Sequence, residues 1–284
     1  MQNESNQLTL VIGGTGKTGR RIVDRLTAMG RPVRVASRSA EPAFDWAAPE
    51  TWGPALDGVS AIYITFAPDL SVPGAPEAIQ QLTDLAKQRG VERVVLLSGR
   101  GEVEAQACEV IVQRSGIDWT VVRAAWFNQN FNEGAFLDLV MSGVVRLPAG
   151  EALEPFVDVD DIADVAIAAL TEDGHANRLY ELTGPRLMTM AEAVETVAKA
   201  AGVSVAYQPV TMDEFRADLA AAHVPEDYVG LLTYLFGEMQ HGHNAFVAYG
   251  VQQALGREPR DFALYAADTA ATGVWAGAGE AVAS

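Results

Sequence analysis

Three glycines near the start of the chain have a spacing that suits phosphate binding. Gly13, Gly16 and Gly19 fall in the stretch Gly-Gly-Thr-Gly-Lys-Thr-Gly, which directly follows the apolar residues 8–12. Glycine permits backbone angles closed to other residues, lets the chain approach a pyrophosphate, and leaves amides free at the positive end of a following helix. We therefore predict a dinucleotide-binding turn rather than a glycine-rich turn with a purely structural role. Its residues are Gly13, Thr15, Gly16, Lys17, Thr18 and Gly19.

The triplet Gly16-Lys17-Thr18 also resembles the end of the phosphate loop of nucleoside triphosphatases. That motif requires a further glycine five residues before its Gly-Lys pair. Val11 occupies this position. The loop is therefore too short for a triphosphatase.

The residues that follow the second apolar run (residues 32–36) indicate whether the chain binds NAD(H) or NADP(H). Enzymes that use NAD carry an Asp or Glu about 20 residues after the glycine turn, where the carboxylate binds the ribose hydroxyls. This chain has Ala36-Ser37-Arg38 there, so no acid repels a 2′-phosphate, and Arg38 and Ser37 offer hydrogen-bond donors. The sequence predicts NADP(H), bound through Ser37 and Arg38. The alternative is that Arg38 lies on a solvated loop.

The elements that must position this turn alternate in type along the first half of the chain. Apolar runs predict strands, and helical spacing of apolar residues predicts the helices between them. Such alternation indicates right-handed parallel crossovers, so we expect an α/β fold with a doubly wound parallel (Rossmann) sheet. The strands are expected at 8–12, 32–36, 61–66, 93–98 and 119–123, and the helices at 17–29, 75–89 and 102–114.

After Arg123 the pattern loosens. Short strands are expected at 156–159 and 178–183 around a helix at 162–170, with helices at 191–201 and 213–222. We predict a Rossmann domain over residues 7–185, with 127–155 partly in the second domain. A smaller α-rich domain over 186–284 would form the substrate pocket, and its alanine-rich tail, 276–284, is expected to be frayed.

The composition limits the partners of the chain. Its 284 residues are 49% hydrophobic, with 37 acidic against 20 basic residues and a net charge of −17. No basic stripe could neutralise a run of phosphates, so we expect no direct binding to nucleic acid. A small-molecule acceptor is the expected partner. A homodimer and a regulatory protein partner both stay open.

The cellular location follows from similar observations. No apolar run approaches the roughly 20 residues of a membrane-spanning helix, so no membrane association is expected. The first seven residues lack the basic and apolar regions of a signal peptide. The single cysteine, Cys108, cannot form an intrachain disulfide, which suits a reducing compartment. We expect a cytoplasmic protein.

Several segments together resemble the NmrA-like family, a branch of the atypical short-chain dehydrogenase/reductase superfamily. The resemblance covers most of the chain, although each segment alone is weakly specific. Besides the glycine turn, the segments are Phe44-Asp45-Trp46, Ser115-Gly116, and residues 125–130, 155–163, 180–185 and 255–262.

The resemblance implies further site residues. The adenine would lie near Asp45, and the end of a strand at Phe66, Ala67 and Pro68 would pass the ribose on the nicotinamide side. Ser98 and Gly99 would rim the nicotinamide pocket. Trp126, Phe127 and Asn128 would form the substrate pocket, although both aromatic residues could instead belong to the core.

The usual catalytic pair of the superfamily is missing. Typical members use Tyr-x-x-x-Lys on the helix after Ser98, where the lysine lowers the pKa of the tyrosine that shuttles a proton. Residues 101–109 here contain neither type, and Ala105 stands where some family members keep a lysine. We therefore assign no catalytic residue. A conjugated acceptor can still take a hydride directly from the nicotinamide and a proton from water.

Three other candidate sites, namely a histidine pair, an acidic group and a cysteine, are explained more simply without a metal or a catalytic role. His241 and His243 form a poor metal site, since no third ligand is near them in the sequence. The acidic group of Asp158, Asp160 and Asp161 could bind a cation, but a helix cap explains it more simply. Cys108 lies on the apolar side of its helix and is expected in the core. We predict no metal.

These observations favour an NADPH-dependent reductase of a quinone-like or other small conjugated acceptor, acting by direct hydride transfer. The alternative is a non-catalytic sensor of NADP(H) that acts through a protein partner, which the missing tyrosine and lysine favour. An isomerase or epimerase of a nucleotide-sugar is disfavoured by the same absence.

Overall fold

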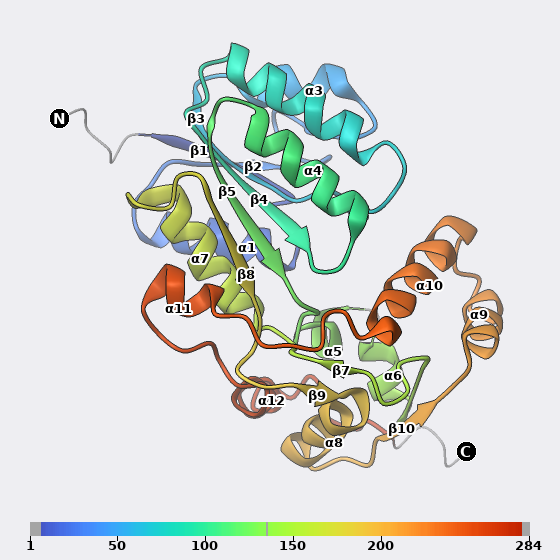
Figure 1. Cartoon of the computed structure of the whole chain (residues 1–284). Helices are drawn as coiled ribbons and strands as arrows, with labels where there is room; N and C mark the ends of the chain where they lie inside the picture. Colours follow the sequence, from blue (N-terminus) through green and yellow to red (C-terminus); the bar gives the residue numbers. More distant parts are fainter. Residues whose placement is uncertain (1–6, 135, 280–284) are drawn as a thin grey trace. The chain divides into compact units, whose positions relative to one another are not determined.

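A six-stranded parallel sheet forms the centre of the first of two compact units (Figure 1). The computed structural model describes residues 7–134 and 136–279. The strand order is β2-β1-β3-β4-β5-β8, with every neighbouring pair parallel. The strands are β1 (Leu8–Ile12), β2 (Val33–Ala36), β3 (Val59–Ile64), β4 (Arg93–Gly99), β5 (Asp118–Ala124) and β8 (Arg178–Leu182).

Helices cover both faces of this sheet. The helices α3 and α4 pack together on one face, and α1 and α7 on the other (Figure 1). Apolar residues fill the strands because both faces are covered; Leu10, Val11 and Ile12 of β1, for example, are almost completely buried. The helices of this unit are α1 (Lys17–Ala28), α2 (Trp52–Ala55), α3 (Ala75–Gln88), α4 (Val103–Arg114), α7 (Val159–Thr171) and α11 (Gly250–Leu255), with a short 3₁₀ turn at Pro49–Thr51.

The strand order places a topological switch point between β1 and β3. The chain leaves β1 toward β2 on one side and returns to β3 on the other. Ligands of open α/β sheets bind outside the carboxyl ends of the strands at such a point. The glycine turn follows β1 and Phe66 follows β3, so both lie at this edge. The predicted doubly wound fold is confirmed.

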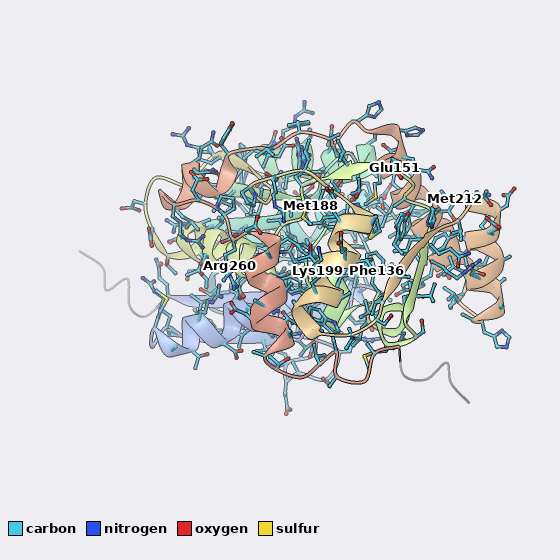
Figure 2. All side chains as sticks on the ribbon, turned by 90° about the horizontal axis from the view of Figure 1, so that it is seen from below. Phe136, Glu151, Met188, Lys199, Met212 and Arg260 are labelled. Atoms are coloured by element: carbon cyan, nitrogen blue, oxygen red, sulfur yellow. The ribbon has the colours of Figure 1, made fainter. Side chains whose placement is uncertain are left out.

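The second unit comprises Ala125–Asp158, Thr183–Ala248 and the residues from Glu258 onward. Its core is rich in aromatic rings, and Figure 2 labels two core members, Phe136 and Met188. Two small sheets, β6 with β10 and β7 with β9, accompany the helices. The elements are α5 (Asn130–Glu133), α6 (Leu137–Met141), β6 (Val144–Leu147), β7 (Leu153–Glu154), β9 (Met188–Thr189), α8 (Met190–Ala201), β10 (Ala206–Pro209), α9 (Met212–Ala221), α10 (Glu226–His241) and α12 (Phe262–Ala270).

The predicted strand at 156–159 is wrong. Val157 makes only an isolated bridge with Phe127, and α7 begins at Val159. The apolar character of this segment reflects burial, since Phe156 and Val157 are almost fully enclosed.

Two features near the C-terminus also differ from the sequence expectation. Tyr249–Arg257 clusters with the first unit, because Gly250 packs so closely on β8 that a Cβ there would lie 2.3 Å from the carbonyl oxygen of Glu181. Residues 276–279 are not frayed, since Ala278 is buried and the Gly279 amide donates to the Met141 carbonyl oxygen. The rest of that tail, 280–284, lies outside the described residues. None of the helices in the described ranges is long and apolar enough to cross a membrane.

Candidate dinucleotide-binding site

The glycine turn closes tightly between β1 and α1. Gly13 has a φ of +70°, and the Gly16 amide donates to the Gly13 carbonyl oxygen at 2.8 Å. A Cβ on Gly13 would lie 2.1 Å from the hydroxyl oxygen of Thr65, and one on Gly19 would lie 2.2 Å from the Gly13 carbonyl oxygen. Glycine at these positions therefore lets α1 approach the turn and β3 approach β1, as a pyrophosphate-binding turn requires.

The N-terminus of α1 leaves its backbone amides available to an anion. Gly16 is the N-cap residue, so no side chain caps the helix, and the first turn contains no acid. The uncapped amides and the helix dipole together favour a phosphate. Thr15 is exposed and Lys17 half-buried beside this end, whereas Thr18 is buried against the core.

The residues after β2 lie next to the turn, since the Gly13 amide donates to the Ala36 carbonyl oxygen at 3.1 Å. The Ser37 carbonyl oxygen accepts from the Phe44 amide and thereby fixes the loop. The Arg38 side chain is exposed, and within the described residues it forms no hydrogen bond or ion pair. An arginine with no partner beside a phosphate-binding turn can bind a further phosphate.

An aromatic cluster lines the segment around Asp45. Trp46 packs on Phe66 with ring centroids 4.5 Å apart, and its indole Nε1 donates to the Thr65 carbonyl oxygen. Phe44 and Trp52 complete the cluster. Ala67 and Pro68, which follow Phe66, are exposed.

The Asp45 carboxylate accepts a hydrogen bond from within its own segment. One oxygen accepts from the Ala47 amide at 3.0 Å, and the Asp45 carbonyl oxygen accepts from the Trp52 indole. The family resemblance implied an adenine contact for Asp45 and gave no role to Trp46 or Trp52. Their signal was the aromatic composition of residues 44–52.

At the end of β4, the Ser98 hydroxyl is directed into the protein. It donates to Glu109 Oε1 at 2.7 Å, and the same carboxylate makes a bidentate ion pair with Arg123. Glu109 is buried, and so is Ala105 at the lysine position of some family members. This network joins α4 to β4 and β5. It holds the hydroxyl that was expected to rim the nicotinamide pocket.

The three residues predicted for the substrate pocket have different surroundings in the second unit. Trp126 is half-buried and stacks on Phe136, so it contributes to the aromatic core. Phe127 is half-buried. Asn128 is completely buried, and neither its side-chain oxygen nor its side-chain nitrogen has a hydrogen-bond partner. A buried amide without partners is costly and indicates a place where a ligand or water binds.

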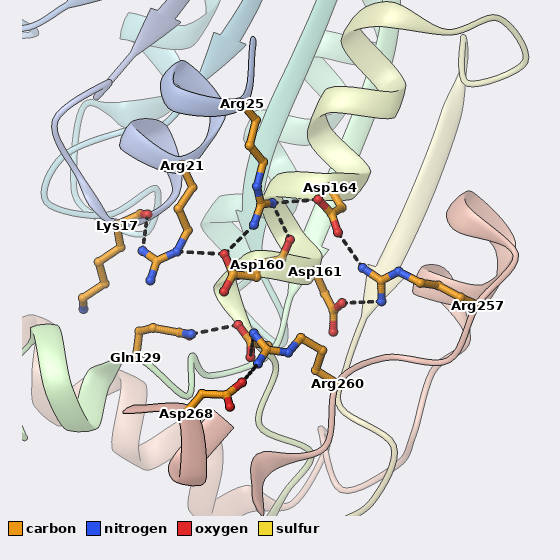
Figure 3. Close-up of polar contacts among 11 residues, drawn as sticks. Lys17, Arg21, Arg25, Gln129, Asp160, Asp161, Asp164, Arg257, Arg260 and Asp268 are labelled. Atoms are coloured by element: carbon orange, nitrogen blue, oxygen red, sulfur yellow. Dashed lines mark hydrogen bonds and ion pairs between the residues drawn. The ribbon is translucent and has the colours of Figure 1, made fainter. Parts of the chain in front are cut away.

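Arginines neutralise the acidic group at the start of α7 (Figure 3). The ion pairs are Asp158 with Arg260, Asp160 with Arg21 and Arg25, and Asp161 with Arg257. The sequence alone indicated a helix cap or a cation here and not these pairs, because Arg21 lies 139 residues from Asp160 and Arg257 lies 96 residues from Asp161.

The remaining candidates fit the simpler interpretations. Cys108 is buried, and burial, assisted by the charge of Glu109, raises the pKa of its thiol to about 12, so it is a core residue. His241 and His243 lie beside each other at the end of α10 with ring centroids 5.8 Å apart. Over residues 7–134 and 136–279, no group of three or more His, Cys, Asp or Glu could hold a metal ion.

Comparison with known proteins identifies the family of the chain. A family model described as NAD(P)H-binding matches residues 13–173. The oxidoreductase YesF of Bacillus subtilis (strain 168) is 34% identical over 94% of this chain and 97% of its own length. The NAD(P)H azoreductase of Xenophilus azovorans is 30% identical over 91% of this chain and 96% of its own.

Among solved structures, the triphenylmethane reductase of Citrobacter sp. in complex with NADP(H) has a similar fold. Its TM-score is 0.78 at 21% identity, covering 92% of this chain and 99% of that chain. The chain belongs to the NAD(P)H-binding family of oxidoreductases. The solved structure of NmrA, a negative transcriptional regulator in complex with NAD, shares its fold with a TM-score of 0.71 at 14% identity, covering 95% of this chain and 98% of that chain.

The residues present fit a dinucleotide. The turn admits no side chain at Gly13 or Gly19, and the amides at the start of α1 are uncapped. The backbone amides of the first turn of α1, which begins at Lys17, would hold the pyrophosphate, and the glycines would let it approach them. When bound, a reduced nicotinamide would supply a hydride, which is one proton with two electrons.

Proposed function

We propose that this protein is an NADPH-dependent reductase of small conjugated acceptors such as quinones or azo dyes. The observation that carries the proposal is the α4 helix, which contains neither a tyrosine nor a lysine and has Ala105 where some family members keep a lysine. Without that pair, the chain lacks the usual apparatus for alcohol dehydrogenation. An acceptor that takes hydride directly needs only to be oriented against the nicotinamide.

The preference for NADP(H) rests on the end of β2. Arg38 is exposed and without a partner in the described residues, and Ser37 provides a second donor. A guanidinium binds a 2′-phosphate with two parallel hydrogen bonds, and no carboxylate competes for it. The similar Citrobacter reductase was crystallised with NADP(H), which supports this choice.

The acceptor contact is assigned to Phe127 and Asn128, with Trp126 as their support. Asn128 is the only one of the three with unsatisfied polar atoms, and its amide can bind an acceptor carbonyl through the nitrogen. A site built to pair with a polar acceptor group discriminates strongly against molecules that lack it.

A non-catalytic sensor of NADP(H) is the second candidate, favoured by the missing tyrosine and lysine. Purified protein is mixed with NADPH and a panel of quinones, azo dyes and triphenylmethane dyes, and the loss of NADPH absorbance is followed. Turnover above the protein-free rate, lost in Gly16→Asp, supports the reductase. Tight NADPH binding without turnover of any acceptor supports the sensor instead.

A further inference from the structure

The side chain of Glu102 folds back over the end of β4. Glu102 is the N-cap residue of α4, yet its carboxylate makes no capping hydrogen bond to the helix. It lies instead against Gly99, where a Cβ would be 2.0 Å from Glu102 Oε1. Only 8% of Glu102 is exposed, although its neighbour Val103 is 72% exposed, more than any other large apolar residue in the described part of the chain. The absence of a side chain at Gly99 makes this position possible.

A second carboxyl group lies against Glu102. Asp69, in the loop after β3, is close enough to Glu102 for its carboxyl group to raise the pKa of Glu102 by its charge and by hydrogen bonding. One oxygen of Asp69 accepts from the amide and the hydroxyl of Ser71 at 2.8 and 2.7 Å, which fixes its orientation. The pair therefore joins the carboxyl ends of β3 and β4.

The surroundings of Glu102 favour its neutral form. Burial is the largest cause, and the charges of Asp69 from the β3 loop and of Glu104 and Glu109 from α4 act in the same direction. Together they raise the pKa of Glu102 to about 9. The Oε2 atom is buried and has no hydrogen-bond partner. At neutral pH this is a carboxylic acid with an unused polar atom.

We propose that Glu102 is the proton donor in the reduction of the acceptor, with Asp69 as its positioning residue. This inference rests on the proposed function. In this proposal Glu102, and not water, supplies the proton. Glu102 lies at the carboxyl end of β4, where the family resemblance implies that the nicotinamide binds. Gly99 and residues 66–68 flank the Asp69–Glu102 pair in the sequence.

The proton and electron balance of the step is complete. A quinone becomes a hydroquinone by gaining one hydride, which NADPH supplies as it becomes NADP⁺, and one proton. The O–H bond of the Glu102 carboxyl breaks as its proton moves to the acceptor oxygen, leaving a carboxylate. Asp69 is half-buried, so the pair can regain a proton from solvent. General acids contribute roughly 100- to 10,000-fold to such rates.

Glu102→Gln tests the donor because it preserves the shape of the side chain and cannot transfer a proton in the same way. Glu104→Gln is the matched control, since it removes an exposed carboxylate from the same turn of α4. The activity measurement is kcat for the best acceptor against pH. Infrared difference spectroscopy of the cofactor-free protein reports independently on the protonated carboxyl group.

The wild type is expected to show a carboxylic-acid band at pH 7 that disappears as the pH passes about 9. Its kcat should fall over the same range. Glu102→Gln should lose the band and this pH dependence, with kcat lower by about 100-fold or more and NADPH affinity unchanged. Glu104→Gln should keep the band at pH 7, the rate and the NADPH affinity, and should shift the pH at which the band and kcat change only downward, because it removes one of the charges that raise the pKa of Glu102.

Two other outcomes are informative. If the wild type reduces acceptors and Glu102→Gln keeps its rate, or if no band is present at pH 7, the donor role is overturned and the reductase stands. If the wild type reduces no acceptor, the proposed function fails and the donor role with it; the band then shows only that Glu102 holds a proton.

Discussion

The carbonyl oxygen of Gly13 lies where the side chain of any larger residue at position 19 would need to be. A Cβ on Gly19 would stand 2.2 Å from that oxygen and 2.8 Å from the Cα of Gly14. Both contacts are with backbone atoms, which cannot move aside without changing the turn. The packing of α1 against the turn therefore depends on the missing side chain.

Gly19→Ala is expected to disrupt the turn. Because the added methyl collides with backbone, the free energy of unfolding should fall by about 1 to 3 kcal/mol, and NADPH binding should be lost. Urea denaturation and fluorescence titration with NADPH measure the two effects. Gly230→Ala, in α10, is the control, since nothing lies within 4 Å of its Cβ position and alanine favours helix. Equal effects of both variants would contradict the proposed role of the turn.

Arg38→Ala is expected to remove the preference for NADPH. Losing a charge-assisted hydrogen bond should weaken NADPH binding by roughly 10- to 150-fold, whereas NADH, which has no 2′-phosphate, should bind as before. The preference of the wild type should also decrease at high salt because an exposed ion pair is screened. Calorimetric titration of both dinucleotides gives the comparison.

Arg31→Ala is the matched control for Arg38. It removes the same charge at the opposite end of β2, two residues before Val33. NADPH affinity of Arg31→Ala should equal that of the wild type. If Arg38→Ala binds NADPH within twofold of the wild type, Arg38 is a solvated loop residue.

Local sequence patterns were sufficient to predict the parallel sheet and the glycine turn. The structures of β1 and of the glycine turn after it depend mainly on residues that are adjacent in the sequence, so both could be predicted from the sequence. The helix α10 was missed because Gly230 and Gly237 interrupt an otherwise apolar segment and weaken its pattern. The strand β10 was missed because it is short, largely exposed and ends in Pro209.

Pairs of distant residues could not be predicted in the same way. Glu102 and Asp69 follow two different strands, and only the sheet topology shows that β3 and β4 are neighbours. The sequence of α4 showed that the helix has no tyrosine or lysine. It gave no indication that Glu109 would bind both Ser98 and Arg123.

Cys108 is expected to be unreactive in the folded protein. Its thiol pKa is raised from 9.0 to about 12, so the reactive thiolate is about a thousandfold scarcer at pH 8 than in the unfolded chain. Iodoacetamide should modify the protein only after unfolding in urea, as followed by mass spectrometry. As the pH rises above 9, the thiol ionises in the unfolded chain before it ionises in the folded protein, which favours unfolding. The contribution of Cys108 to the free energy of unfolding is therefore fully present below pH 9 and is lost as the pH rises toward 12. Rapid alkylation of the native protein would contradict a core position.

Asn128→Leu is expected to separate stability from function. Asn128 is completely buried with both polar atoms unpaired, so an apolar residue of similar size should raise the free energy of unfolding by about 1 kcal/mol. If the amide binds the acceptor, kcat/KM should fall at least tenfold with NADPH affinity unchanged.

Gln129→Leu is the matched control for Asn128→Leu, because the neighbouring amide is also buried but donates to Asp158 at 2.8 Å. It should lower the free energy of unfolding by about 1 to 3 kcal/mol, since it removes a satisfied hydrogen bond to a charged group. Urea denaturation and the NADPH absorbance assay are run on both variants. A less stable Asn128→Leu with wild-type turnover would show that Asn128 supports the fold and does not contact the acceptor.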